Sequence, residues 1–405
     1  MNNKIKLAVA GAVLASASVA NAGITWDAGE WTVDMNGNVN AFATYADNKD
    51  NNAAISGGLA NAPGANDDSE VAIQTGLLPS WLGFTATTRQ NDIDTSVTIS
   101  FQPGAGNTRA LGGGNSTNAE TENRQAFLTF GDKSWGSVKV GKDLGIFGST
   151  AILNDMTLLG VGANGAGTNG GGTTTTLGGI GTGYIYADWI GQIAYTTPNM
   201  NGFQATLGIT QPWNTLNLSA ASATANGTTD NFGYQGQASY SWTGDFAGKA
   251  WAGFFAQEVT GVTAANNSED VNVFEAGISA TVMNIGLVAY AYSGDGVGTT
   301  GLLMDGFDAN GNKRDSDGGY VQATYVIPMG TKLGISYGLS KLDDNAVDAG
   351  ADLVKQNERI TVGAYHPLTK HLNLVAEYSQ VESETYAATG DLETDIFSVG
   401  AILFF

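Results

Sequence analysis

The sequence predicts an all-β protein, a transmembrane antiparallel β-barrel of 16 strands. Apolar and polar residues alternate with a period of two in segment after segment up to the last residue, which is typical of strands with two different faces. The connections between these segments are alternately short and long. After residue 22, no stretch has the roughly 18 consecutive apolar residues of a membrane-spanning helix.

The first 22 residues have the organisation of a secretory signal peptide. A positively charged start is followed by an apolar stretch from Leu7 to Ala20, which is shorter than the about 20 residues that a spanning helix needs. Small residues at 20–22 then match a cleavage site. We therefore expect a signal peptide at 1–22 and a single barrel domain at 23–405.

The composition excludes several classes of protein. There is no cysteine, so no disulfide or thiolate metal site can form. Glycine occurs 57 times in 405 residues, well above the usual share of about 7%, whereas proline occurs only 7 times. A formal charge of −21 makes nucleic acid an improbable partner, because a phosphate backbone binds basic surfaces.

The opening strand shows the pattern clearly. Trp31, Val33 and Met35 share one face with Val39, and polar residues fill most of the other face. Similar segments follow to the end of the chain. The predicted strands are 31–45, 80–88, 95–102, 124–130, 137–141, 189–197, 203–210, 233–242, 249–259, 273–282, 285–293, 318–327, 332–342, 358–365, 372–380 and 395–405.

The connections predict which end of the barrel faces which compartment. Outer-membrane barrels have short periplasmic turns and longer outer loops. The short connections are 89–94, 131–136, 198–202, 243–248, 283–284, 328–331 and 366–371. The long ones are 46–70, 103–123, 142–188, 211–231, 260–272, 294–317, 343–357 and 382–394. Because a sheet in lipid cannot leave an edge unpaired, it has to close on itself.

Alternation alone does not decide which face is inside, since a soluble sandwich would bury its apolar face. Aromatic residues near strand ends favour a barrel with interfacial girdles; they are Trp31, Tyr45, Trp189, Trp242 and Tyr378. The final strand alternates Phe397, Val399, Ala401 and Leu403 up to the terminal Phe405. This pattern resembles the C-terminal signal by which the barrel assembly machinery recognises outer-membrane proteins.

Four segments resemble the Gram-negative general porin family, which includes neisserial and betaproteobacterial porins. Residues 80–84 (SWLGF) are similar to its SRLGFKG strand, and residues 123–127 (NRQAF) to its NRQAFVGL strand. Residues 136–142 (GSVKVGK) resemble GTVTLGR, and 193–199 (IAYTTPN) resemble IRYDSPNF. One departure is Ala194, where the family often has a lumen-facing arginine.

The resemblance implies a homotrimer in the cell outer membrane, in contact with lipid and lipopolysaccharide, whose third loop folds into each barrel as a constriction. That loop is 142–188, in which 149–159 is expected to form a short helix. The implied function is passive diffusion of small hydrophilic solutes and ions through a water-filled channel. No enzymatic activity and no cofactor are expected.

Alternation and the resemblance together select the residues expected to line the pore. Lys139 and Arg359 lie between outward residues and should point inward, as should the acids Glu377, Glu275 and Asp34. Arg124 shares its parity with apolar residues, and only the resemblance places it in the pore. The remaining candidates are expected on or beside the constriction loop; they are Lys142, Asp143 and Asp155.

The long connections hold most of the 38 acidic residues, which favours a mild cation preference at the outer mouth and divalent-cation binding there. In 294–317, acidic and amide residues are spaced as in a calcium loop, but Lys313 occupies the place of the required glycine. A solvated acidic loop is therefore the favoured interpretation. The alternative functions are a substrate-specific channel for an oligosaccharide or organic acid, and a secreted adhesin. His366 and His371 flank a short turn, which suits neither a protease nor a zinc site.

Overall fold

The computed structural model describes residues 23–50, 52–62, 68–106, 121–163, 175–216, 231–262, 268–348 and 352–405; the expected signal peptide lies outside them. Within these residues strand follows strand, with two short helical segments in one long connection and one in another. The strands are β1 Ile24–Ala28, β2 Trp31–Asn48, β3 Ser69–Gln74, β4 Trp81–Gln90, β5 Ile93–Pro103, β6 Thr121–Asp132, β7 Gly136–Leu144, β8 Trp189–Thr196, β9 Phe203–Thr210, β10 Gly233–Trp242, β11 Phe246–Thr260, β12 Ser268–Val282, β13 Ile285–Asp295, β14 Asp315–Val326, β15 Lys332–Leu342, β16 Val354–Pro367, β17 Leu372–Thr385 and β18 Leu392–Phe404. The helical elements are α1 Ser149–Asn154, η1 Met156–Leu159 and η2 Ala346–Asp348.

The strands form one closed antiparallel barrel. Each strand from β4 to β18 pairs with the next, and β18 pairs with β2, where Val399 stands opposite Ala43. β2 pairs with β4 and completes a ring of 16 strands. All sixteen predicted segments correspond to strands of this ring, so the predicted fold class and strand number are confirmed.

The short strands β1 and β3, which both pair with β2, were not predicted. β3 pairs with residues 42–47 of β2, and β4 pairs with residues 32–38. β3 and β4 therefore make up one interrupted strand of the wall. Between them the chain turns into the barrel and buries Leu77 and Leu78. β1 forms a hairpin with the start of β2, next to the point where Phe405 and Gly37 exchange two backbone hydrogen bonds of 2.9 and 3.0 Å. The first strand of the described residues and the C-terminal residue therefore meet on one strand.

The apolar face is the outer face. On β18, Phe397 and Val399 are 50% and 59% exposed, whereas Ser398 between them is 3% exposed. The same division runs around the ring, with exposed Ile99, Leu207 and similar residues outside and buried polar side chains inside. A soluble sandwich would show the reverse. The arrangement is that of a membrane barrel, with an apolar exterior and a polar interior.

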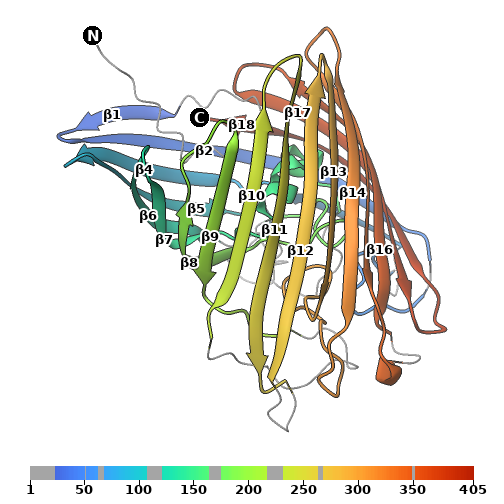
Figure 1. Cartoon of the computed structure of the whole chain (residues 1–405). Coiled ribbons are helices and arrows are strands. Elements are labelled where there is room, and N and C mark those ends of the chain that lie inside the picture. Colours follow the sequence, from blue (N-terminus) through green and yellow to red (C-terminus); the bar gives the residue numbers. More distant parts are fainter. Residues whose placement is uncertain are drawn as a thin grey trace, which may run out of the picture.

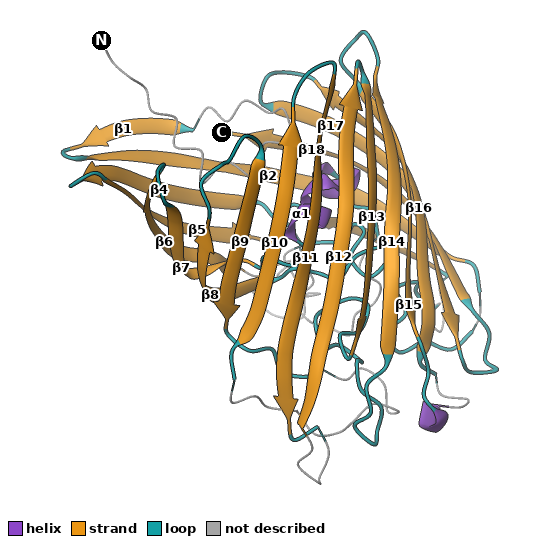
Figure 2. Cartoon of the chain, in the orientation of Figure 1, coloured by secondary structure: helices purple, strands orange, loops and turns teal. Residues whose placement is uncertain are grey.

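The long connections gather at one end of the barrel and the short turns at the other, as Figure 1 shows. Inside the ring, Figure 2 shows α1 and the loop that carries it surrounded by strands. This loop connects β7 to β8, and its described residues are 145–163 and 175–188. Among the described residues, none of the helices is long and apolar enough to cross a membrane.

Candidate constriction site

The loop between β7 and β8 is fixed along one side of the interior by hydrogen bonds to the barrel wall. Thr150 Oγ1 donates to Gln237 Oε1 of β10 at 2.7 Å. Met156 N donates to Gln322 Oε1 of β14 at 2.6 Å, and Gln322 Nε2 donates in turn to the carbonyl of Asn154 at 3.0 Å. The expected helix is present, but Asp155 divides it into α1 and η1.

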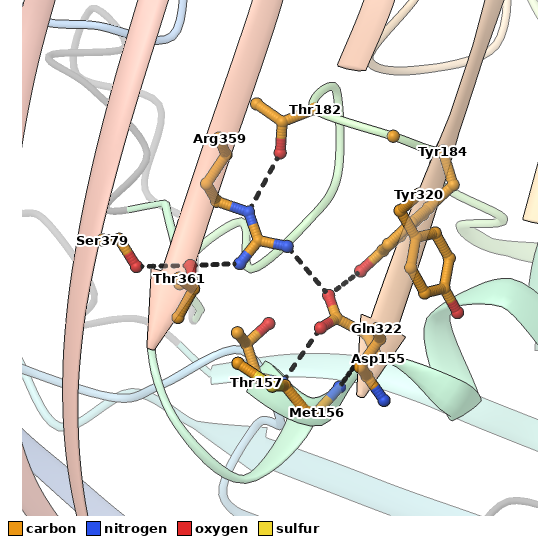
Figure 3. A network of polar contacts seen from close by, with 12 residues as sticks. Asp155, Met156, Thr157, Thr182, Tyr184, Tyr320, Gln322, Arg359, Thr361 and Ser379 are labelled. Atoms are coloured by element: carbon orange, nitrogen blue, oxygen red, sulfur yellow. Dashed lines mark hydrogen bonds and ion pairs between the residues drawn. The ribbon is translucent and has the colours of Figure 1, made fainter. Parts of the chain in front are cut away.

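Asp155 and Arg359 form the centre of this attachment (Figure 3). Their closest charged atoms are 3.8 Å apart, and both side chains are 1% exposed. The Asp155 carboxylate also accepts hydrogen bonds from the Tyr184 hydroxyl at 2.8 Å and from Thr157 N at 2.9 Å. The acid of the loop therefore lies directly against a base of the wall, and both side chains are buried.

Arg359 is held from the wall side as well. Its Nη1 donates to Thr361 Oγ1 at 2.7 Å, and its Nε donates to Thr182 Oγ1 at 3.2 Å (Figure 3). Thr361 belongs to the same strand as Arg359, whereas Thr182 belongs to the returning part of the loop. The guanidinium therefore joins both passes of the loop to β16.

Two buried glutamates bind backbone N–H groups of the loop. Glu275 accepts from Gly148 N at 3.1 Å, and Glu377 accepts from Val161 N at 2.7 Å. A Cβ on Gly160 would lie 2.1 Å from a Glu377 oxygen, so only glycine permits this approach. Glu377 does point inward as expected, but the structure uses it to hold the loop.

A cluster of aromatic rings lies under the loop and was missed by sequence reasoning. Tyr184 of the loop packs edge-on against Tyr320 of β14, with ring centroids 5.7 Å apart. Tyr320 lies 5.7 Å from Tyr290, which stacks at 6.4 Å on Trp251. All four side chains are at most 5% exposed. Aromatic residues on barrel strands are ordinarily assigned to the lipid face. The one signal in the sequence is that Tyr290 is an odd number of positions from the apolar Leu287 on β13, which places the two side chains on opposite faces of the strand.

Among the described residues, two cavities lie between the loop and the opposite wall, and they share the side chains of Leu144 and Leu153. The first, of about 510 Å³, is lined mainly by polar residues and carries Lys139 and Lys249 among hydroxyl and amide groups. The second, of about 430 Å³, has a largely apolar lining that includes Trp81. The loop therefore fills the side of the barrel interior near β13 to β17. The open space lies on the other side, between the loop and β4 to β12.

Arg124 reaches the second cavity because of a β-bulge. The pairing of β5 with β6 shifts between Ser100 and Gln102, so that one additional residue is inserted in β6. Beyond this bulge the alternation changes phase, and Arg124 faces inward with 6% of its surface exposed. Its Nε lies 2.7 Å from the Glu122 carboxylate. The parity argument failed here, whereas the position implied by the resemblance is the one observed.

Lys139 and Lys142 lie on opposite faces of β7. Lys139 points inward and forms an ion pair with Asp143, four residues further along the same strand. Lys142 is exposed on the outer face and donates a hydrogen bond of 2.8 Å to the carbonyl of Asn123. The expectation that Lys142 lines the pore is therefore wrong, because it has the parity of the outward Val140. Asp143 is on the inner wall, where Lys139 of the same strand neutralises its charge.

The remaining expected residues lie away from the loop. Asp34 is on the inner face of β2 near the short turns, where it accepts a hydrogen bond of 2.5 Å from Asn36 Nδ2. In the outer loop 294–317, Asp308 accepts backbone hydrogen bonds from Asn310 and Asn312. The described residues contain no cluster of three potential metal ligands among His, Cys, Asp and Glu. The calcium interpretation therefore gains no support.

Arg314 and Asp348 connect two outer loops through a fully buried ion pair of 2.7 Å. Arg314 Nη1 also donates to the carbonyls of Asp305 and Phe307, at 2.7 and 2.8 Å. Burial alone would raise the pKa of the Asp348 carboxyl, but hydrogen bonds from Arg314 and from Asn345 N hold that pKa below its ordinary value. Asp348 is therefore charged in the folded loop.

The comparisons with known proteins agree with this architecture. A family profile described as Gram-negative porin matches residues 8–386. The outer membrane channel DcaP of Acinetobacter baumannii has 17% sequence identity and a TM-score of 0.65, with 95% of this chain and 99% of that chain covered. For the anion-selective porin from Comamonas acidovorans, the identity is 16%, the TM-score 0.62 and the coverage 93% and 100%.

OmpT of Vibrio cholerae, in a trimer form, is 15% identical with a TM-score of 0.56, and the alignment covers 93% of this chain and 100% of that chain. Identities this low show the fold alone. No curated protein sequence matches the chain significantly. The family profile, however, spans nearly the whole sequence, and it agrees with the closed barrel and its apolar exterior. The chain belongs to the Gram-negative porin family and is a channel protein that crosses the outer membrane as a β-barrel.

Proposed function

We propose that this porin is a general diffusion channel for small hydrophilic solutes and ions, in which the loop between β7 and β8 forms the constriction. The observation that carries the proposal is the pair of cavities between that loop and the wall of β4 to β12, joined at Leu144 and Leu153. One cavity is lined by hydroxyl, amide and ammonium groups, which replace water around a polar solute.

The loop is suited to a constant constriction because its attachment is rigid. Buried charge-assisted hydrogen bonds are strong and geometrically specific. Asp155, Glu275 and Glu377 supply such bonds at three places along the loop. The aromatic cluster excludes water beneath it. A solute therefore has to pass on the open side, past Lys139, Arg124 and the polar groups near them.

We also propose a mild preference for cations. The outer loops are strongly acidic, and their potential enriches cations at the mouth within about 8–10 Å at physiological salt. Within the cavities, Arg124 is paired with Glu122 and Lys139 with Asp143, so neither base presents its full charge to a passing ion. Lys249, which also lines a cavity, adds positive charge and therefore weakens the preference for cations.

Assembly into homotrimers is part of the same proposal. A shallow apolar groove on the outer surface runs across β2, β3 and β15 to β18, and small residues such as Ala43 and Ala364 line it together with Tyr45, Phe397 and Val399. A second copy of the chain fits such a groove better than disordered lipid does. We further propose that lipopolysaccharide surrounds the acidic outer loops through divalent cations, and that Phe405 serves as the assembly signal.

Reconstitution of the purified protein into planar bilayers tests the proposal. Conductance should appear in steps of three, remain ohmic and persist without any added substrate. In a salt gradient, the reversal potential should have the sign of a weakly cation-selective pore. Sugars of increasing size should enter liposomes at decreasing rates, with no sugar saturating the flux. A closed barrel without conductance would refute the diffusion function, and a clear anion preference would refute the selectivity.

A further inference from the structure

The apolar cavity is unusual for a water-filled channel. Leu77 and Leu78 of the inward-turned segment line it, together with Leu158 and Ile180 of the loop and with Trp81. An apolar wall of this kind offers no hydrogen bonds or charges to a sugar or an inorganic ion. It binds a hydrocarbon or aromatic body, since removing apolar surface from water contributes roughly 25 cal/mol per Å².

One end of the cavity is polar and has more negative than positive charge. Glu122, Arg124 and Asp188 all line it. Glu122 pairs with Arg124, and among the described residues no ion pair engages Asp188. Desolvation by the surrounding protein raises the pKa of the Asp188 carboxyl, which accepts a hydrogen bond of 2.7 Å from the backbone N–H of Trp189.

Aromatic faces lie beside this carboxylate. The Trp189 indole donates to the Tyr186 hydroxyl at 2.9 Å, and the Arg124 guanidinium lies 5.8 Å from the indole centroid. The indole already accommodates one cation. A carboxylate next to an indole is the combination that holds an organic ammonium group, through charge and through the ring quadrupole. Asp188 is also held at φ 52°, a left-handed conformation that Asp and Asn adopt more readily than other side chains.

We infer that this cavity is a binding site for a small organic cation, an amine carried on an aromatic or short hydrocarbon body. The ammonium group would lie against Asp188 and Trp189, and the body between Leu158 and Ile180. This inference rests on the proposed function, because the cavity belongs to the route of diffusion. It deepens that function by adding a class of solute that would bind in transit and slow the passage of ions.

Single-channel recording with 2-phenylethylammonium tests the site. Added to the outer side, the amine should interrupt the current at millimolar concentration. Phenylacetate and 2-phenylethanol, which have the same ring with an anionic or a neutral end, should need at least about ten times more. Asp188→Asn keeps the shape and the backbone preference and should weaken the block by the amine about tenfold. The control Asp245→Asn removes a charge from an exposed turn at the other end and should change nothing.

The outcomes are distinguishable from a failure of the diffusion function. Block by phenylacetate at lower concentration than the amine would overturn the inference and assign the head group to Arg124. An unchanged block in Asp188→Asn would overturn it too, although the open channel would still conduct. If the wild-type barrel did not conduct at all, the diffusion function would be lost, and calorimetric titration of the amine into the detergent-solubilised protein would still decide whether the cavity binds it.

Discussion

The closest charged atoms of Asp155 and Arg359 are 3.8 Å apart inside the barrel, one residue on the loop between β7 and β8 and the other on β16, and both side chains are 1% exposed. Facing charges of this kind, separated by water, would set an electric field across a pore. Here they are in contact, and each is completed by hydroxyl groups of neighbouring residues. Their effect is to fix the position of the loop, and the charge that solutes meet comes from other residues.

Arg359→Met should loosen the loop between β7 and β8. The substitution leaves the buried carboxylate of Asp155 without its cation, and breaking a buried pair in this way costs about 3 kcal/mol. Amide hydrogen exchange of 148–162 should become faster, and the open-channel current should become noisier because the loop leaves the wall.

Lys355→Met is the matched control, since Lys355 forms an exposed ion pair of 2.7 Å with Glu384 on the next strand. Exposed pairs are worth at most about 1 kcal/mol. Equal protection of the loop in the two variants would show that the buried contact does not hold it.

Lys139→Cys and Lys142→Cys should respond oppositely to a charged, membrane-impermeant thiol reagent. Lys139 lines the polar cavity, so attachment of a bulky group there should reduce the conductance. Lys142 lies on the outer face of β7, where the same modification should leave the current unchanged. The chain contains no cysteine, so each variant has a single reactive thiol. A current reduced by labelling at position 142 would contradict the assignment of the two faces.

The barrel could be predicted from the sequence because its physics is local. Each strand must alternate between lipid and water, and each turn must reverse the chain, so both leave their pattern in a few adjacent residues. The inward positions of Lys139, Arg359 and Glu377 followed from the same alternation. The expected helix at 149–159 was also confirmed, apart from its division at Asp155.

What could not be predicted depends on pairs of residues far apart in the chain. No local pattern indicates that Glu377 binds the N–H of Val161, or that Tyr184 covers Tyr320. The bulge opposite Gln102 changes the phase of β6, and a period-two count cannot see it. The apolar cavity likewise forms only when residues from several strands and two loops meet.

The link between the outer loops should fail in acid. Asp348 has a lowered pKa, so its ion pair with Arg314 contributes stability above the unfolded pKa of about 3.9, and this contribution is lost as the pH falls through the lower folded pKa. Hydrogen exchange in 296–314, corrected for the intrinsic rate, should therefore be unchanged from pH 7 to pH 5 and increase below about pH 4. Asp348→Asn should show the loosened loop already at pH 7, whereas the exposed Asp344→Asn should not. Protection that persists in Asp348→Asn would contradict the role of the pair.

Val399→Arg should prevent the proposed trimer. Val399 is 59% exposed and lines the apolar groove, so a charge there would be buried at the contact with a second chain. Leu207→Arg is the control: Leu207 is 60% exposed on β9, outside that groove, and a charge there meets the same lipid. Both variants lose stability by up to about 2–4 kcal/mol, depending on depth in the bilayer. In detergent, light scattering should give a monomer for Val399→Arg and a trimer for Leu207→Arg. Since the lipid cost is common to both, a difference in assembly can arise only from the groove, and equal behaviour would place the subunit contact elsewhere.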